Sequence, residues 1–160
     1  MKRRDFIRNM MIMGMGLALA PEVIAKQVAE AAWQDGGNVR PGVAIRQTHL
    51  SFRSLTNRRV TDAIIVHHIG NTNADVSAET VHQWHLANGW AGIGYHFLIR
   101  KDGSIEQGRP MDTVGAHCYG ENEHTVGVNI VGNFEDYMPE DAQMVSAKRL
   151  LAALWRNYGL

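Results

Sequence analysis

The run Ile64-Ile65-Val66-His67-His68 constrains the fold of this chain more than any other segment. β-Branched side chains are stiff at χ1 and pack well on a pleated surface, so the run predicts a strand. Four apolar residues in succession, 63–66, indicate a strand covered on both faces, as at the centre of a sheet. The strand carries His67 to its end, where a side chain stands on a rigid support. Imidazole is the commonest metal-ligating side chain, which makes His67 a candidate metal ligand.

The rest of the chain alternates strand and helix patterns. Strands are predicted at 95–100 and 104–107, joined by an Asp-Gly turn of the hairpin type, and at 125–131. Helices are predicted over 78–88 and 140–157 from their capping residues and apolar faces. Interleaved strands and helices predict an α/β domain with a mixed central β-sheet flanked by helices.

Composition excludes several classes of protein. The chain has 160 residues, enough for one domain with a proper core, and a formal net charge of zero. Lys and Arg are scattered rather than gathered in a stripe, so no nucleic-acid partner is expected. The one cysteine, Cys118, excludes an internal disulfide framework.

Residues 1–25 are predicted to be an export signal. A basic start precedes an apolar run that is shorter than the roughly 20 residues needed to span a bilayer. Arg3-Arg4 followed by Phe6 resembles the twin-arginine signals that bacterial machinery reads. We expect an exported protein of the periplasm or cell envelope, with no stable membrane span once the signal is removed. An uncleaved membrane tether is the alternative.

The predicted domain boundary lies shortly after this segment. Residues 26–47 contain breaks at Gly36-Gly37 and Pro41-Gly42 and are expected to form a linker or arm. The domain is expected to cover 48–160.

A series of short motifs follows the first strand in a characteristic order: Gln83-Trp84-His85, Gly89-Trp90, Gly94-Tyr95-His96, Lys101-Asp102-Gly103, Gly108-Arg109, Gly115-Ala116-His117 and Val126-Gly127-Val128. Together with His67, this order resembles the zinc-dependent N-acetylmuramoyl-L-alanine amidases. That superfamily includes the phage lysozyme-type amidases and the peptidoglycan recognition proteins. The resemblance runs from about Arg58 to the C-terminus.

The resemblance implies roles for particular residues. His67 matches a zinc ligand, and Tyr95 matches the tyrosine that lies beside the zinc-bound water in active members. Peptidoglycan is the implied partner, and the candidates for binding it are His68, Trp90, His117, Asn122 and Asn133. His68 would point to the opposite face from His67 in a regular strand. His85 and His96 are expected to have packing and structural roles.

The chain also departs from the family pattern. The other two zinc ligands, a His and a Cys or Asp, normally follow the long C-terminal helix, and here the chain stops at Leu160 with that helix just completed. We therefore expect an amidase-like domain that is C-terminally incomplete, either a fragment or a genuine short form. Cys118 as a substitute thiolate ligand is an alternative, although neighbours such as His117 and Cys118 seldom point to one metal.

Three functions follow from these patterns. The first is hydrolysis of the N-acetylmuramoyl–L-alanine amide bond by zinc-activated water. The second is a non-catalytic peptidoglycan-binding module that keeps the groove without the metal. The third is an exported α/β domain of unrelated function. With one family ligand visible, these 160 residues are expected to bind zinc weakly and to show little amidase activity.

Overall fold

A computed structural model of the chain describes residues 42–160. The predicted export signal and residues 26–41 of the predicted linker lie outside the described residues. The elements, in chain order, are β1 (Ile45–Arg46), β2 (Ala63–His68), α3 (Ala78–Ala87), β3 (Phe97–Ile99), β4 (Ile105–Gln107), β5 (Thr125–Ile130) and α4 (Asp141–Tyr158).

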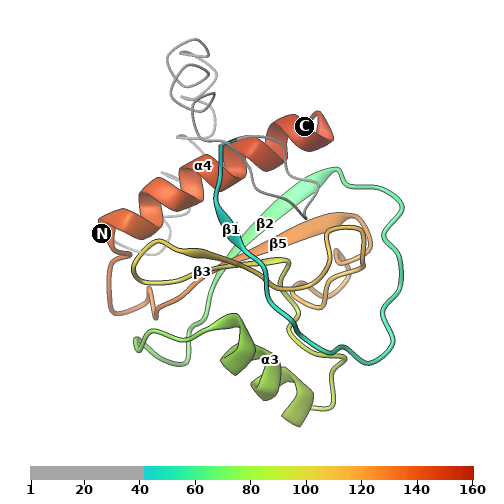
Figure 1. The fold of residues 1–160 in the computed structure, drawn as a ribbon, viewed down its shortest axis with the longest axis horizontal. Helices are drawn as coiled ribbons and strands as arrows, with labels where there is room; N and C mark the ends of the chain where they lie inside the picture. The colour runs from blue at the N-terminus through green and yellow to red at the C-terminus, as the bar shows by residue number, and fades with distance from the viewer. Residues whose placement is uncertain (1–41) are drawn as a thin grey trace.

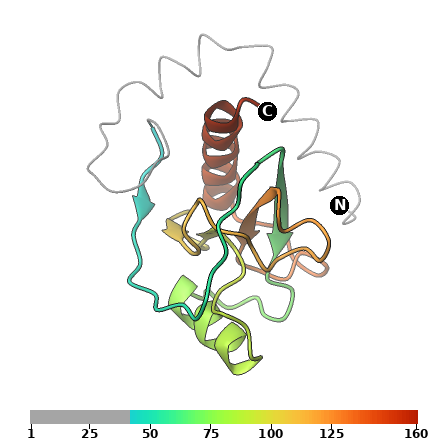
Figure 2. The ribbon, with the colours of Figure 1, turned by 90° about the vertical axis from the view of Figure 1, so that its right-hand side faces the viewer.

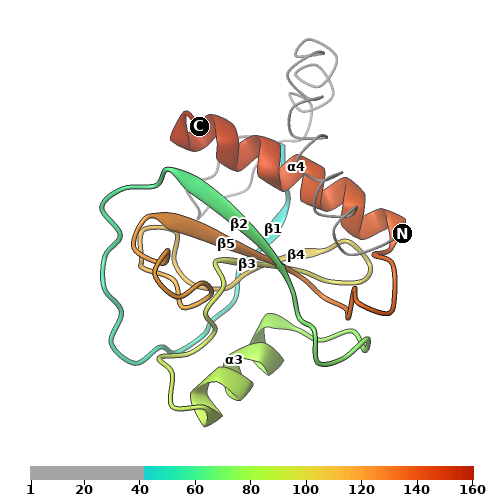
Figure 3. The same ribbon diagram turned by 180° about the vertical axis from the view of Figure 1, so that it is seen from behind.

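The five strands form one mixed sheet in the order β1-β4-β3-β5-β2. Only β3 and β4, the predicted hairpin, are antiparallel; the other neighbouring pairs are parallel (Figure 3). The predicted α/β class with a mixed sheet is confirmed. The sheet also includes Ile45–Arg46, so it extends into the range that we expected to be linker.

One expectation about β2 is wrong. The apolar run predicted a central strand, but among the described residues β2 pairs only with β5 and lies at the edge of the sheet. The run is apolar because both faces of this edge strand are covered by other parts of the protein. Ile64 and Val66 pack into the core beneath α4, while Ile65 and His67 point to the other face.

The sheet is the middle layer of three, with α4 across one face and α3 across the other (Figures 1 and 2). The α4 side holds the larger core, which contains Phe97, Ile99, Val126, Val128, Ile130, Leu150 and Leu154. The α3 side holds a smaller core of Val76, Ala78, Val81, Ile93, Leu98 and Val131. Within residues 42–160, no helix is long and apolar enough to cross a membrane.

The apolar face of α4 agrees with the predicted one except at Trp155. Of the residues expected on the apolar face, Ala147 and Leu154 are buried and Leu151 and Tyr158 pack against the core. Trp155 is the exception at 59% exposed, and Leu150 and Ala153 are buried in addition. The buried face begins at Gln143, a fully buried residue whose amide donates to Val131 O at 2.8 Å. Residues 147, 150 and 154 follow it on the same face at helical spacing.

Helix α3 is anchored to the sheet at its N-terminus. Ser77 is the N-cap, and its hydroxyl accepts from Thr80 N–H at 3.2 Å, as the sequence predicts. The fully buried Glu106 on β4 accepts from Ala78 N–H at 2.6 Å. A carboxylate is favourable here because the first N–H groups of a helix lack partners and carry a partial positive charge.

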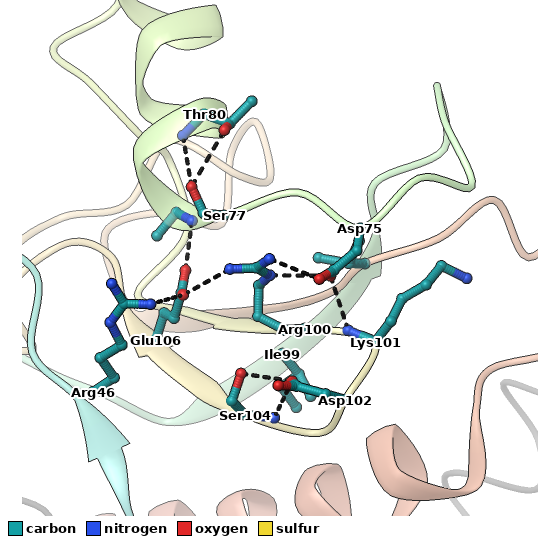
Figure 4. Close-up of polar contacts among 12 residues, drawn as sticks. Arg46, Asp75, Ser77, Thr80, Ile99, Arg100, Lys101, Asp102, Ser104 and Glu106 are labelled. Atoms are coloured by element: carbon teal, nitrogen blue, oxygen red, sulfur yellow. Dashed lines mark hydrogen bonds and ion pairs between the residues drawn. The ribbon is translucent and has the colours of Figure 1, made fainter.

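The charge of Glu106 is balanced by two arginines (Figure 4). Arg46 on β1 and Arg100 after β3 donate to its Oε1 at 3.1 and 3.0 Å. Arg100 also pairs with Asp75 in the loop before α3. This network connects β1, β3, β4 and α3, and so fixes the helix over the sheet face that carries His67.

Candidate functional site

His67 is the penultimate residue of β2 and lies on the α3 face of the sheet. Its neighbour in the register of β5 is Asn129, which faces the same way. His68 points to the opposite face, as predicted. There its ring stacks on Phe134 and its Nδ1 accepts from Phe134 N–H at 3.0 Å. The structure therefore separates His68 from His67.

His117 lies directly against His67. The distance from His67 Nε2 to His117 Nδ1 is 3.0 Å. The hydroxyl of Thr125 donates to Glu121 O at 2.6 Å, so it accepts from His117 Nε2–H at 3.4 Å. A neutral His117 then has its lone pair on Nδ1, and His67 Nε2–H donates to it.

Two glycines make room for the His117 ring. A Cβ added at Gly115 or at Gly127 would lie 2.4 Å from His117 Cδ2. Gly127 is on β5, so the ring lies flat against the sheet where any other residue would displace it. The Gly115-Ala116-His117 and Val126-Gly127-Val128 motifs are therefore linked structurally, because the glycine of each leaves space for the His117 ring.

Asn122 supports this arrangement from the loop. Its Oδ1 accepts from the backbone N–H of His117 at 2.8 Å and from that of Cys118 at 3.0 Å. Asn133 uses its side chain within its own loop, where it donates to Asp136 and accepts from Glu135 N–H.

Tyr95 extends the site as part of a row of rings. Its ring centroid is 5.5 Å from that of His67 and 5.7 Å from that of His85. Trp90 packs on His85 at 4.6 Å and is 43% exposed at the end of the row. His85 has the expected packing role, and its Nδ1 accepts from Gly94 N–H at 2.9 Å. Three candidates, His67, His117 and Tyr95, thus come together, with Trp90 at the margin.

Two arginines, the buried Arg109 and the half-buried Arg58, hold the loops around these rings. Arg109 donates to Ile93 O and Val114 O on either side of the strand that begins after Tyr95. Arg58 donates to Thr125 O and to the hydroxyl of Tyr158 on α4. These hydrogen bonds connect the loops of the site to β5 and to α4.

His96 has the expected structural role. It is fully buried, and its Nδ1 accepts from Gly127 N–H at 3.0 Å. Its proton is therefore on Nε2, which donates to Thr113 O at 2.9 Å. Its ring also packs against His117 at 5.8 Å.

Sequence reasoning missed Asn129. The residue is fully buried, and its carboxamide N and O make no regular hydrogen bond to the described residues. It lies near enough to Tyr95 to favour the ionised phenol. The signal was available, since the alternation of β5 places an amide on an inward face among apolar residues.

The imidazoles of the site are neutral at pH 7. Burial lowers the pKa of His67, and the neighbouring His68 lowers it further. Burial, followed by the charge of His67, lowers the pKa of His117 to about 4. Burial raises the pKa of Tyr95, which therefore keeps its proton and can donate it in a hydrogen bond.

The donor set does not complete a catalytic zinc centre. Such a centre takes three protein ligands and leaves one position open. Within residues 42–160, no group of three or more His, Cys, Asp or Glu side chains could hold a metal ion. Two imidazoles converge, those of His67 and His117.

Comparison with known proteins places this geometry in a family. The model of the family described as N-acetylmuramoyl-L-alanine amidase matches residues 56–160. The endolysin of Escherichia phage T7 is 39% identical over 107 residues, which cover 63% of this chain and 71% of the endolysin. Peptidoglycan-recognition protein SC2 of Drosophila melanogaster is 34% identical over 108 residues, 64% of this chain and 58% of that protein.

Solved structures agree with the sequence comparison. The N-acetylmuramoyl-L-alanine amidase LysC from Clostridium intestinale URNW superposes with a TM-score of 0.70 at 33% identity, covering 73% of this chain and 78% of LysC. Peptidoglycan recognition protein SA from bumblebee superposes with a TM-score of 0.65 at 26% identity, covering 72% and 77%. The expected resemblance is confirmed, and this chain belongs to the N-acetylmuramoyl-L-alanine amidase family.

Proposed function

We propose that this protein acts on peptidoglycan at the amide bond between N-acetylmuramic acid and L-alanine. Its family membership and the names of its relatives support this substrate. The single observation that supports the site is the convergence of Tyr95 with His67 and His117 on one sheet face.

Each residue has a proposed role in that reaction. The protonated Tyr95 hydroxyl donates to the oxyanion that develops on the scissile carbonyl. Trp90, exposed at the margin of the row of rings, packs against the glycan or the stem peptide. His117, Asn122 and Asn133 remain proposed contacts to the substrate, the first two through the loop that Asn122 orders. His68 lies on the opposite face of the sheet, against Phe134, and is not assigned a contact at this site.

Zinc is the proposed cofactor, with His67 as a ligand. When bound, zinc would activate water and polarise the carbonyl. The described residues do not supply the three ligands of such a centre, so no step of the reaction is assigned through the metal.

The same observation favours a second candidate function. A site with two converging imidazoles and an exposed tryptophan can bind a muropeptide without hydrolysing it. This would be a non-catalytic peptidoglycan-binding module.

One experiment separates the two functions. The purified full chain is incubated with insoluble peptidoglycan and with muropeptides, with and without added Zn²⁺, and both sedimentation and release of stem peptide are measured. Binding with zinc-dependent release supports the amidase. Binding alone supports the module, and an absence of both refutes the proposal in either form.

We also propose that residues 1–25 direct export to the periplasm or cell envelope by the twin-arginine route. The support is the Arg3-Arg4 pair with its short apolar run. Changing both arginines to Lys should retain the protein in the cytoplasm. Unchanged export of that variant would refute the route.

A further inference from the structure

We infer that Asn129 is a positioning residue for Tyr95: its buried carboxamide directs an N–H at the phenol oxygen, which leaves the phenol proton free for the substrate. The inference deepens the proposed function and rests on it in one respect, the role of Tyr95 as a donor to the oxyanion.

Asn129 lies in the sheet on the same face as the rings of the site. It is on β5, the strand between β3 and β2, and its register partners are Leu98 on β3 and His67 on β2. Paired residues of neighbouring strands share a face, so all three side chains point toward α3. Tyr95 lies two residues before β3, and its ring packs against His67 and the core on this face.

A carboxamide is an unusual group in these surroundings. Asn129 is fully buried, yet its side-chain N and O have no regular hydrogen-bond partner among the described residues. Its neighbours on the same face, Leu98 and Val131, belong to the apolar core beneath α3. A buried amide without a partner costs free energy, and an apolar side chain of the same shape avoids that cost. Packing alone therefore does not account for an amide at this position.

The hydroxyl of Tyr95 is within the influence of this amide. Burial raises the pKa of Tyr95, and the side chain of Asn129 opposes that rise. An amide N–H has this effect, because it stabilises negative charge on the phenol oxygen, whereas an amide oxygen has the opposite effect. The contact is looser than a regular hydrogen bond in this structure, as is common for active-site contacts before a substrate binds.

The direction of donation determines what the hydroxyl can do. When the phenol oxygen of Tyr95 accepts from Asn129, its own proton points away from the amide and is available to another acceptor. Hydrogen bonds in a chain polarise one another, so a phenol that accepts from an amide is a stronger donor. The hydroxyl is then oriented before negative charge develops on the substrate, which is the requirement for preorganised stabilisation of an oxyanion.

Carbon-13 NMR of the full chain tests the contact without substrate. Tyrosine is labelled at Cζ, whose shift responds to hydrogen bonds at the hydroxyl, and the Tyr95 signal is the one that Tyr95→Phe removes. Asn129→Leu keeps the shape of the side chain and removes the donor. It should shift the Tyr95 signal and leave the signals of the exposed Tyr119 and Tyr137 in place. Asn129→Val removes the same donor and should act alike, and thermal unfolding checks the fold of both variants.

A double-mutant cycle tests the consequence for the reaction. Single-turnover release of stem peptide, measured with added Zn²⁺, should fall about tenfold in Asn129→Leu, while sedimentation with peptidoglycan is retained. In the Tyr95→Phe background the same substitution should have no further effect, because the hydroxyl through which Asn129 acts is absent. A purely structural role would lower the rate equally in both backgrounds.

Gln143→Met is the matched control. It removes another fully buried amide, which belongs to α4 on the opposite side of the sheet and donates to Val131 O. The folded variant should leave the Tyr95 signal and the rate of release unchanged.

Two results would overturn the inference. One is a Tyr95 signal that is identical in the wild type and in the folded Asn129 variants. The other is a loss of release that is the same with and without the Tyr95 hydroxyl. If the wild type releases no stem peptide, the amidase form of the proposed function fails, and the NMR signal alone decides whether Asn129 donates to Tyr95.

Discussion

At the scale of single residues, Tyr95 separates chemistry from binding. Tyr95→Phe removes one hydroxyl from a ring that keeps its contacts with His67 and His85. If the hydroxyl stabilises the oxyanion, stem-peptide release should fall by ~10²-fold while sedimentation with peptidoglycan is retained. Single-turnover assays at high protein concentration with added Zn²⁺ measure the rate. An unchanged rate would reduce Tyr95 to a packing residue.

Asn129 predicts an unusual effect on stability. Its buried carboxamide lacks a regular hydrogen bond among the described residues, so replacing it with the similarly shaped Leu should leave the free energy of unfolding unchanged or raise it by about 1 kcal/mol. Gln143→Met is the matched control, because that buried amide does have a partner in Val131 O. It should cost about 1–3 kcal/mol. Urea unfolding measures both, and equal losses would show that Asn129 has a stabilising partner.

The residues of the site were only partly predictable from sequence. Tyr95 and His67 could be named because each matches a motif of the family, and the alternation of β2 also fixes the face of His67, whereas Tyr95 lies just before β3. The contact between His67 and His117 could not, since it depends on a loop that Asn122 shapes and on a slot beneath Gly127. Strand periodicity carries no information about such a loop.

At the scale of elements, Glu106 links α3 to the sheet. Glu106→Leu would leave Ala78 N–H without its buried acceptor and remove the partner shared by Arg46 and Arg100, so we expect a loss of about 3 kcal/mol. Glu106→Gln keeps an acceptor and should cost less. Thermal unfolding measures both, with the exposed Glu123→Ala as a control within about 0.5 kcal/mol. Equal effects of Leu and Gln would contradict the proposed role of the helix N–H.

The elements themselves were predicted well where local signals were strong. The Ser77 cap, the Asp102-Gly103 turn and the Gly159 C-cap, which adopts a left-handed conformation, correspond to boundaries in the structure. The exposure of Trp155 on α4 and the edge position of β2 were missed, because both depend on contacts between distant segments. A helical period shows that a helix has an apolar face without showing which side chain determines its angle.

At the scale of the whole molecule, buried neutral histidines make stability depend on pH. Burial lowers the pKa of His85 and His117 to about 4, while unfolding returns each to about 6.5. The unfolded chain therefore binds more protons between these values, and stability present above pH 6.5 is lost as the pH falls toward 4. The Tm of the metal-free protein should drop between pH 7 and pH 4.5, and His117→Gln should flatten the profile. A Tm independent of pH in this range would contradict the burial of neutral rings.

The parallel pairing of β2 with β5 also has a consequence for how the protein folds. His67 and His117 are separated by 50 positions along the chain, and they meet only when those two strands have paired across the intervening hairpin and helix. Contacts between such distant segments form slowly, because the entropy of closing the loop is lost before the contact is gained. A partly folded chain can already contain α3, α4 and the hairpin while its two imidazoles are still far apart. We therefore expect this pair to form late in folding, and the contact to report on the pairing of β2 with β5.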